Sequence, residues 1–191
     1  ETMKFNPLFF SLAVIPLLYY LFHYVRVQYN LPSQTSMVVA FSRAVGEIIP
    51  VVPGFSDPFA ESFLPFVYRW RIQIERKKRE MFPFLKPYPM VFRRLSVLMQ
   101  YRTVVLDQAI KDHLPIDQLV ILGAGLDSRA WRLQELKNVK VYEVDHPATQ
   151  AWKKEQVKKI EGERQAEEVK FVAVDFTKDD LSLKLEEAGF D

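Results

Sequence analysis

Cysteine is absent from the 191 residues of this chain. Its absence excludes a disulfide framework, a thiolate nucleophile and a zinc site built on cysteine, and it is compatible with a reducing compartment. Histidine is scarce: His23, His113 and His146 lie far apart and do not show metal-ligand spacing, so no metal site is predicted. A large net charge is also missing, because 26 basic and 24 acidic side chains leave a formal charge of +2. This balance does not indicate a nucleic-acid partner, and none is expected.

The composition is that of a chain that folds. Apolar residues make up 49% and charged residues 26%, which is typical of globular proteins and too apolar for a disordered one. A chain of 191 residues fits one main domain with a sizeable core. Changes in pattern divide it into a hydrophobic segment at residues 1–30, a helical cap and linker region at 31–114, and an α/β region at 115–191.

The N-terminal segment contains 21 consecutive residues without a formal charge, from Phe5 to Val25. That length can span a bilayer, which needs about 20 apolar residues. Tyr19, Tyr20 and Tyr24 suit an interfacial aromatic belt, and no small-residue cleavage site follows, so a membrane anchor fits better than a removed signal peptide. The alternative is a buried or surface-lying helix, kinked at Pro16.

Prolines limit helix length between Leu31 and Pro65, although Ser36 to Ile48 can form one short helix. The next segment, Phe66 to Met81, is rich in arginine and lysine, with Trp70 interleaved. It is interpreted either as a helix lying on anionic lipid beside the anchor, or as a helix with a solvated face of mixed charge. If the anchor is present, this positive cluster favours a cytoplasmic position for everything downstream.

Residues Arg93 to Leu114 show helical periodicity, and Arg102 falls within their apolar stripe. The stripe consists of Leu95, Leu98, Met99, Val105, Leu106, Ala109 and Ile110. A guanidinium on the core-facing side of a helix is costly unless it has an anionic partner. An anion is therefore expected to meet Arg102.

After Pro115 short apolar runs alternate with helical stretches. The runs Leu119 to Leu122, Val139 to Val144 and Val169 to Val174 are predicted as buried parallel strands, and Ser128 to Leu136, Ala148 to Ile160 and Asp179 to Ala188 as helices. This alternation predicts a doubly wound α/β sheet with right-handed crossovers.

The first strand runs into a turn with Gly123 and Gly125, followed by a helix that Asp127 or Ser128 can cap. Two glycines permit a tight turn and let the backbone approach a ligand closely, which is typical of nucleotide-cofactor sites. The third glycine of the dinucleotide fingerprint is absent, since Ser128 stands where it is expected.

Acidic residues stand at the ends of the second and third strands. Asp145 is placed to accept hydrogen bonds from ribose hydroxyls, with a helix cap before Pro147 as the alternative. Glu143, one pleat earlier on the same face, is either a second polar contact or a structural partner for the turn. Asp175 can bond an adenine amino group while its apolar neighbour Phe176 covers the ring.

The runs at 121–133, Ile-Leu-Gly-Ala-Gly-Leu-Asp-Ser-Arg-Ala-Trp-Arg-Leu, and at 142–147, Tyr-Glu-Val-Asp-His-Pro, resemble the signature of the leucine carboxyl methyltransferase family and its bacterial relatives. Asp57-Pro-Phe59 and Tyr101-Arg-Thr103 are similar to weaker upstream motifs of that family, and the resemblance spans roughly 36–191. It implies the N-terminal half of a Rossmann-like class I methyltransferase sheet, preceded by a helical cap and a hydrophobic N-terminal helix.

The resemblance also implies S-adenosyl-L-methionine as the cofactor. In this family an arginine matching Arg102 holds the cofactor's carboxylate, which supplies the anion that the helix pattern calls for. The turn Gly123-Ala124-Gly125 lies against the methionine portion. An acid matching Asp145 holds the ribose, and the pair matching Asp175 and Phe176 reads the adenine.

Two departures from the family pattern affect these expectations. The family's upstream cofactor-contacting lysine has no match, because 31–58 contains no lysine. The chain also stops at Asp191, soon after the third strand, whereas such enzymes have a seven-stranded sheet, so a fragment or a truncated product is expected. A half-sheet of this kind exposes an edge that is prone to association.

The expected activity is transfer of a methyl group to a carboxylate or hydroxyl oxygen of a small molecule or of a protein carboxylate. An ionised carboxylate needs no general base, so no catalytic residue is assigned. Two alternatives remain. One is a non-catalytic membrane-associated or interaction protein built on a truncated methyltransferase fold, and the other is an NAD-dependent oxidoreductase, against which the missing third glycine counts.

Overall fold

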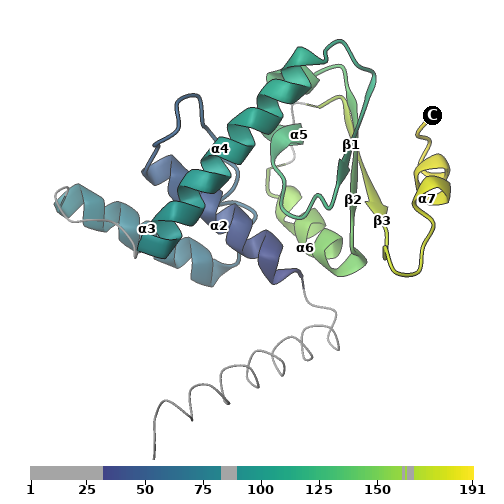
Figure 1. The fold of residues 1–191 in the computed structure, drawn as a ribbon. Coiled ribbons are helices and arrows are strands. Elements are labelled where there is room, and N and C mark those ends of the chain that lie inside the picture. Colours follow the sequence, from purple (N-terminus) through teal and green to yellow (C-terminus); the bar gives the residue numbers. More distant parts are fainter. Residues whose placement is uncertain (1–31, 83–89, 161, 163–165) are drawn as a thin grey trace, which may run out of the picture. The chain divides into compact units, whose positions relative to one another are not determined.

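The computed structural model describes residues 32–82, 90–160, 162 and 166–191 (Figure 1). Residues Ser33–Asp191 form one compact unit. Within the described ranges, none of the helices combines the length and the apolar character needed to cross a bilayer. The candidate anchor at 5–25 lies outside the described residues.

Among the described residues, three helices precede the sheet: α2 (Gln34–Ile48), α3 (Phe66–Met81) and α4 (Met90–Asp112). Helix α2 begins after Ser33, whose hydroxyl accepts a hydrogen bond from the Ser36 N–H at 3.4 Å. It ends just before Pro50, which cannot donate a backbone hydrogen bond. The helices expected at 36–48 and 93–114 are confirmed, each beginning two or three residues earlier than predicted. Helix α2 packs against both α3 and α4.

The sheet contains β1 (Gln118–Leu122), β2 (Lys140–Asp145) and β3 (Glu168–Ala173), in the order β1-β2-β3 and all parallel. The three predicted strands are confirmed to within one residue at each end. Helix α6 (Pro147–Val157) connects β2 to β3, and α7 (Leu181–Glu187) follows β3. Figure 1 shows α5 and α6 on one side of the sheet and α7 on the other, as expected of a doubly wound α/β fold.

The prediction of one continuous helix at 128–136 is wrong. The segment forms a four-residue helix, α5 (Arg129–Arg132), and a 3-10 turn, η1 (Gln134–Leu136). Leu133 separates them because its backbone is extended, with φ −87° and ψ 108°. Its side chain is buried in the core, so the break places one more apolar group inside.

Each face of the sheet contributes to a separate apolar cluster. The larger cluster contains Val141 of β2, packed with Trp131 and with residues of α2 and the following loop such as Phe41 and Phe63. The smaller cluster consists of Tyr142, Val144, Val172 and Val174, with Leu181, Leu185 and Phe190 of the α7 region packed against it. Alternation along β2 sends successive side chains to opposite faces, which explains the division.

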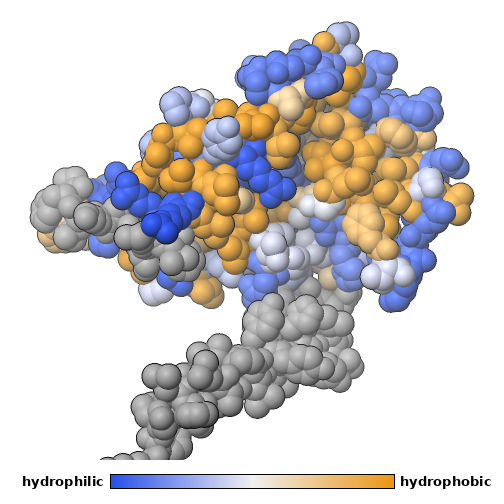
Figure 2. Space-filling model, viewed as in Figure 1, coloured by the Kyte–Doolittle hydropathy of each residue, from blue (hydrophilic) through white to orange (hydrophobic). Residues whose placement is uncertain are grey.

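The expected core-facing stripe of α4 is only partly right: Met99 is buried and Ile110 packs against the core, but most of the stripe is not buried. Apart from Met99, the buried residues of this helix between 93 and 112 are polar: Ser96, Gln100 and Thr103. Gln100 accepts hydrogen bonds from the backbone N–H groups of Val51 and Val52 at 2.8 and 3.1 Å. These bonds compensate for the loss of hydration when the side chain is buried. Other apolar side chains of the stripe are exposed, including Leu98, Val105 and Leu106. Figure 2 shows hydrophobic surface along α4.

Candidate functional site

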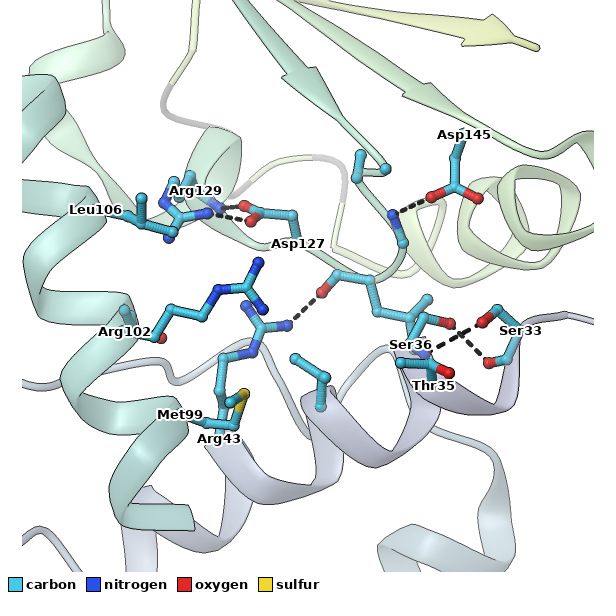
Figure 3. A pocket seen from close by; sticks show the side chains of 16 residues that line it. Ser33, Thr35, Ser36, Arg43, Met99, Arg102, Leu106, Asp127, Arg129 and Asp145 are labelled. Atoms are coloured by element: carbon cyan, nitrogen blue, oxygen red, sulfur yellow. Dashed lines mark hydrogen bonds and ion pairs between the residues drawn. The ribbon is translucent and has the colours of Figure 1, made fainter. Parts of the chain in front are cut away.

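A cavity of about 380 Å³ lies where α2, α4, the glycine turn and the end of β2 meet (Figure 3). Its walls come from segments that are far apart in the sequence, and the turn forms one side. The lining residues are Ser33, Thr35, Ser36, Val39, Arg43, Met99, Arg102, Thr103, Leu106, Gly123, Ala124, Gly125, Leu126, Asp127, Arg129 and Asp145. The structure therefore brings together five of the predicted site residues: Arg102, Gly123, Ala124, Gly125 and Asp145.

The glycine turn has the backbone conformation that glycine favours. Gly123 has φ +61° and Gly125 has φ +53°, in the left-handed region that other residues rarely adopt. At Gly125 a side chain is excluded a second time, because a Cβ atom there would lie 2.9 Å from the Cβ of Ser36. The N–H of Ala124 donates to the Val144 carbonyl at 3.0 Å, which joins the turn to β2. The backbone of the turn thus lines the cavity and is fixed to β2 by this hydrogen bond.

Asp145 faces the cavity from the end of β2. Its Oδ2 accepts a hydrogen bond from the Gly125 N–H at 2.6 Å, and its Oδ1 accepts one from the His146 N–H at 2.7 Å. The interpretation of Asp145 as the cap of the next helix is wrong, because His146 is the N-cap of α6 and its Nδ1 accepts from the Ala148 N–H. The carboxylate instead connects the second strand to the glycine turn.

Arg102 extends from α4 into the cavity, as Figure 3 shows. Its side chain is exposed, so the expectation of a guanidinium buried in the helix core is wrong. The rotation of α4 that buries Gln100 and Thr103 turns Arg102 toward the cavity. Among the described residues nothing forms a hydrogen bond or ion pair with Arg102. Its charge is therefore available to an anion that enters the cavity.

Arg43, on α2, is a second cation in the cavity wall, and the sequence analysis did not select it. It is only 5% exposed. One amino group donates to the Leu126 carbonyl at 2.5 Å, and the other lies 3.2 Å from Oδ2 of Asp57, which is fully buried. The Asp57-Pro-Phe59 motif contains the partner of Arg43, but the burial of Asp57, which makes a nearby cation necessary, is seen only in the structure.

An ion-pair network fixes the segment that follows the turn. Oδ1 of Asp127 accepts from the Arg129 N–H at 2.8 Å, and Oδ2 pairs with the Arg129 guanidinium. Asp107 of α4 binds Arg129 Nε at 2.8 Å and an Arg132 amino group at 2.7 Å. Burial opposes ionisation of Asp127, but Arg129, Arg43 and Lys153 outweigh it and lower the pKa. Asp127 is therefore ionised and supports the turn.

Glu143 belongs to the protein interior and does not line the cavity. Its Oε2 accepts from Lys153 Nζ at 2.5 Å, and both side chains are 1% exposed. Burial raises the pKa of Glu143 to about 7, although the Lys153 charge opposes that rise. Glu143 therefore has a structural role, but its partner is Lys153 of α6 and not the glycine turn that the sequence analysis named.

Asp175 and Phe176 follow β3 and do not line the cavity. Oδ1 of Asp175 accepts hydrogen bonds from the Thr177 N–H at 3.1 Å and the Thr177 hydroxyl at 2.7 Å, and Oδ2 lies 3.0 Å from Lys178 Nζ. These partners lower the pKa of Asp175. The Phe176 side chain is 55% exposed. Contact with adenine stays a prediction for both residues.

The parallel sheet defines a Rossmann-like α/β protein, and a glycine turn with an acid at the end of the next strand is an arrangement typical of nucleotide-cofactor sites in such folds. The profile of the family described as leucine carboxyl methyltransferase matches residues 36–191. The chain belongs to this family, which confirms the resemblance seen in the motifs.

Bacterial proteins named "Putative S-adenosyl-L-methionine-dependent methyltransferase" are similar to the chain. The protein of Mycobacterium ulcerans (strain Agy99) is 35% identical over 165 residues, which cover 82% of this chain and 51% of the relative. That of Mycolicibacterium paratuberculosis (strain ATCC BAA-968 / K-10) is 34% identical over 168 residues, covering 82% and 50%. The chain thus spans about half the length of the curated relatives it matches.

Proposed function

We propose that the chain forms the S-adenosyl-L-methionine-binding part of an O-methyltransferase. The observation that carries the proposal is the position of Arg102, whose guanidinium has no partner among the described residues and shares a cavity with the glycine turn and Asp145. S-adenosyl-L-methionine has matching chemistry, because it carries a carboxylate at one end and a ribose near the other. The family membership and the names of the relatives support the same cofactor.

Each wall of the cavity has a role in this proposal. Arg102 would hold the cofactor's carboxylate through a charge-assisted pair. The backbone of Gly123, Ala124 and Gly125 would lie against the methionine portion, since no side chains block the approach at either glycine. Asp145 would accept hydrogen bonds from the ribose hydroxyls: each carboxylate oxygen has a second lone pair beyond those used by the backbone.

The bound cofactor would supply a methyl group activated by its sulfonium charge. The task of this chain's residues would then be to bind and align it, which can contribute a large part of the rate enhancement when the acceptor is already ionised. A carboxylate acceptor meets that condition at neutral pH. A hydroxyl acceptor would require a general base, and no residue is assigned to that role.

Adenine contact is the finer part of the proposal. Asp175 and Phe176 would approach the adenine from the end of β3, which lies at the same edge of the sheet as Asp145 because Val174 N–H donates to the Asp145 carbonyl at 3.0 Å. The carboxylate of Asp175 is at present engaged by Thr177 and Lys178. Binding of adenine would need that loop to exchange one of these partners.

Calorimetric titration of the chain with S-adenosylhomocysteine and with NAD tests the proposal against its two alternatives. Binding of S-adenosylhomocysteine alone supports the methyltransferase. Binding of NAD alone would identify a dinucleotide site and support the oxidoreductase. Binding of neither compound would support the non-catalytic interaction protein. A methyl acceptor, small molecule or protein carboxylate, can then be sought by transfer of a labelled methyl group.

The cellular position is a separate part of the proposal. We propose that Phe5 to Val25 anchors the chain and that the region downstream lies in the cytoplasm. The uncharged run and the basic segment Phe66 to Met81 support this orientation.

A further inference from the structure

Arg43 joins two parts of the molecule that are far apart in the sequence. From α2 it reaches the Leu126 carbonyl at the end of the glycine turn and the Asp57 carboxylate in the loop before α3. The ion pair between Arg43 and Asp57 is shielded from solvent, since Arg43 is 5% exposed and Asp57 is fully buried. A bidentate guanidinium can hold two acceptors in a fixed relative position, whereas a lysine ammonium acts as a point charge.

The peptide group between Leu126 and Asp127 is consequently held at both ends. Its carbonyl accepts from Arg43, and its N–H, on Asp127, donates to the Ala124 carbonyl at 2.8 Å. Because a peptide group is planar, holding the carbonyl also orients the N–H. The hydrogen bond between Asp127 and Ala124 closes the turn around Gly125.

Helix α2 touches the turn at a second place. The Cβ of Ser36 lies so close to Gly125 that an added Cβ would approach it to 2.9 Å. Seven positions separate Ser36 from Arg43, which is two helical turns, so both residues project from the same face of α2. This face, which also contributes to the cavity, is therefore packed along the glycine turn.

We propose that Arg43 is a positioning residue that sets the conformation of the glycine turn for the cofactor. It acts through the Leu126 carbonyl rather than by touching the ligand. The Gly125 N–H is bonded to Asp145, so a displaced turn would also displace the carboxylate at the end of β2. Loss of Arg43 would then weaken every ligand that uses the turn and Asp145, whether or not the ligand carries a carboxylate.

The informative substitution is Arg43→Lys. It keeps a positive charge beside Asp57, so no buried carboxylate is left uncompensated, but one ammonium cannot reproduce the two arms of the guanidinium. The matched control is Arg76→Lys on α3, whose guanidinium pairs with Glu61 at 2.8 Å and does not line the cavity. A second variant, Arg43→Met with Asp57→Asn, removes both charges together and serves if the lysine variant fails to fold.

Hydrogen exchange of the ligand-free chain tests the positioning role by itself. Amides of the segment 123–129 are expected to exchange about tenfold faster in Arg43→Lys, the factor that corresponds to about 1.4 kcal/mol of opening free energy. The same amides are expected to be unchanged in Arg76→Lys. Unchanged exchange of this segment in the folded Arg43 variants would overturn the proposal, whatever the ligand.

Equilibrium binding then separates positioning from direct contact, and this part rests on the proposed cofactor site. S-adenosylhomocysteine and methylthioadenosine, which lacks the carboxylate, are both expected to lose about tenfold in affinity in Arg43→Lys. A loss confined to S-adenosylhomocysteine would make Arg43 a carboxylate ligand and the positioning role wrong. Failure of the unsubstituted chain to bind either compound would refute the proposed function, while the exchange result still decides the role of Arg43.

Discussion

Replacing Arg102 by alanine tests the proposed carboxylate contact, because no other residue in the described part of the chain forms a hydrogen bond or ion pair with this guanidinium. The substitution should therefore leave the fold intact and change ligand binding alone. Loss of a hydrogen bond to a charged group costs about 1.5 to 3 kcal/mol. The Arg102 side chain is exposed, and solvent screening lowers such a value toward that of a surface pair.

An intermediate loss of about 1 to 2 kcal/mol follows, which is a decrease of about 5- to 30-fold in the affinity for S-adenosylhomocysteine. Methylthioadenosine lacks the carboxylate, so its affinity should hardly change. Arg94→Ala is the matched control, since Arg94 is another exposed arginine of α4 and does not line the cavity. Calorimetry of both ligands with both variants measures the difference.

Equal losses for the two ligands would mean that Arg102 supports the adenosine part of the site or the helix itself. No loss for either would remove Arg102 from the site. In both cases the assignment of the unpaired guanidinium to the cofactor's carboxylate is wrong.

Three further predictions concern other parts of the chain. Asp145→Ala should weaken S-adenosylmethionine by about 1 to 3 kcal/mol in calorimetry, whereas an unchanged dissociation constant in the folded variant would limit Asp145 to holding the turn. The pKa of Glu143 in the folded state is about 7, above its ordinary value of 4.5. Between these two values the folded state binds more protons than the unfolded state, so the free energy of unfolding should fall as the pH rises from 4.5 to 7. Urea unfolding at several pH values should show this slope, and the double substitution Glu143→Gln and Lys153→Met should flatten it; an identical slope in both proteins would contradict the assignment. Carbonate washing of membranes should leave the full chain in the pellet and release a chain that begins near Leu31, and release of the full chain would exclude the anchor.

The strands and the glycine turn were predictable because their signal is local. Val139 to Val144 is a short apolar run, and a buried parallel strand requires little else. Gly123 and Gly125 are likewise informative by themselves, because glycine directly after a strand predicts a turn with a left-handed backbone conformation. The same holds for Asp145, whose position after an apolar run places it at the carboxyl edge of the sheet.

The orientation of α4 was not predictable from periodicity. Its buried side contains Gln100, which becomes favourable in the interior only because the backbone beyond α2 supplies hydrogen-bond partners. Those partners are about 50 residues away in the sequence. Arg43 was missed for a related reason, since a buried arginine is stable only beside Asp57, and that pairing depends on tertiary structure.

The two glycines of the turn differ in what they would tolerate during evolution or engineering. A Cβ on Gly123 would meet no protein atom within 4 Å, so within the protein its requirement is one of backbone angle, although a side chain there would stand on the wall of the proposed cofactor cavity. Gly125 is limited by its angle and by Ser36 together. A substitution at Gly125 would therefore need a compensating change on α2, such as Ser36→Gly. These two positions, 89 residues apart, are expected to vary together among sequences of this fold.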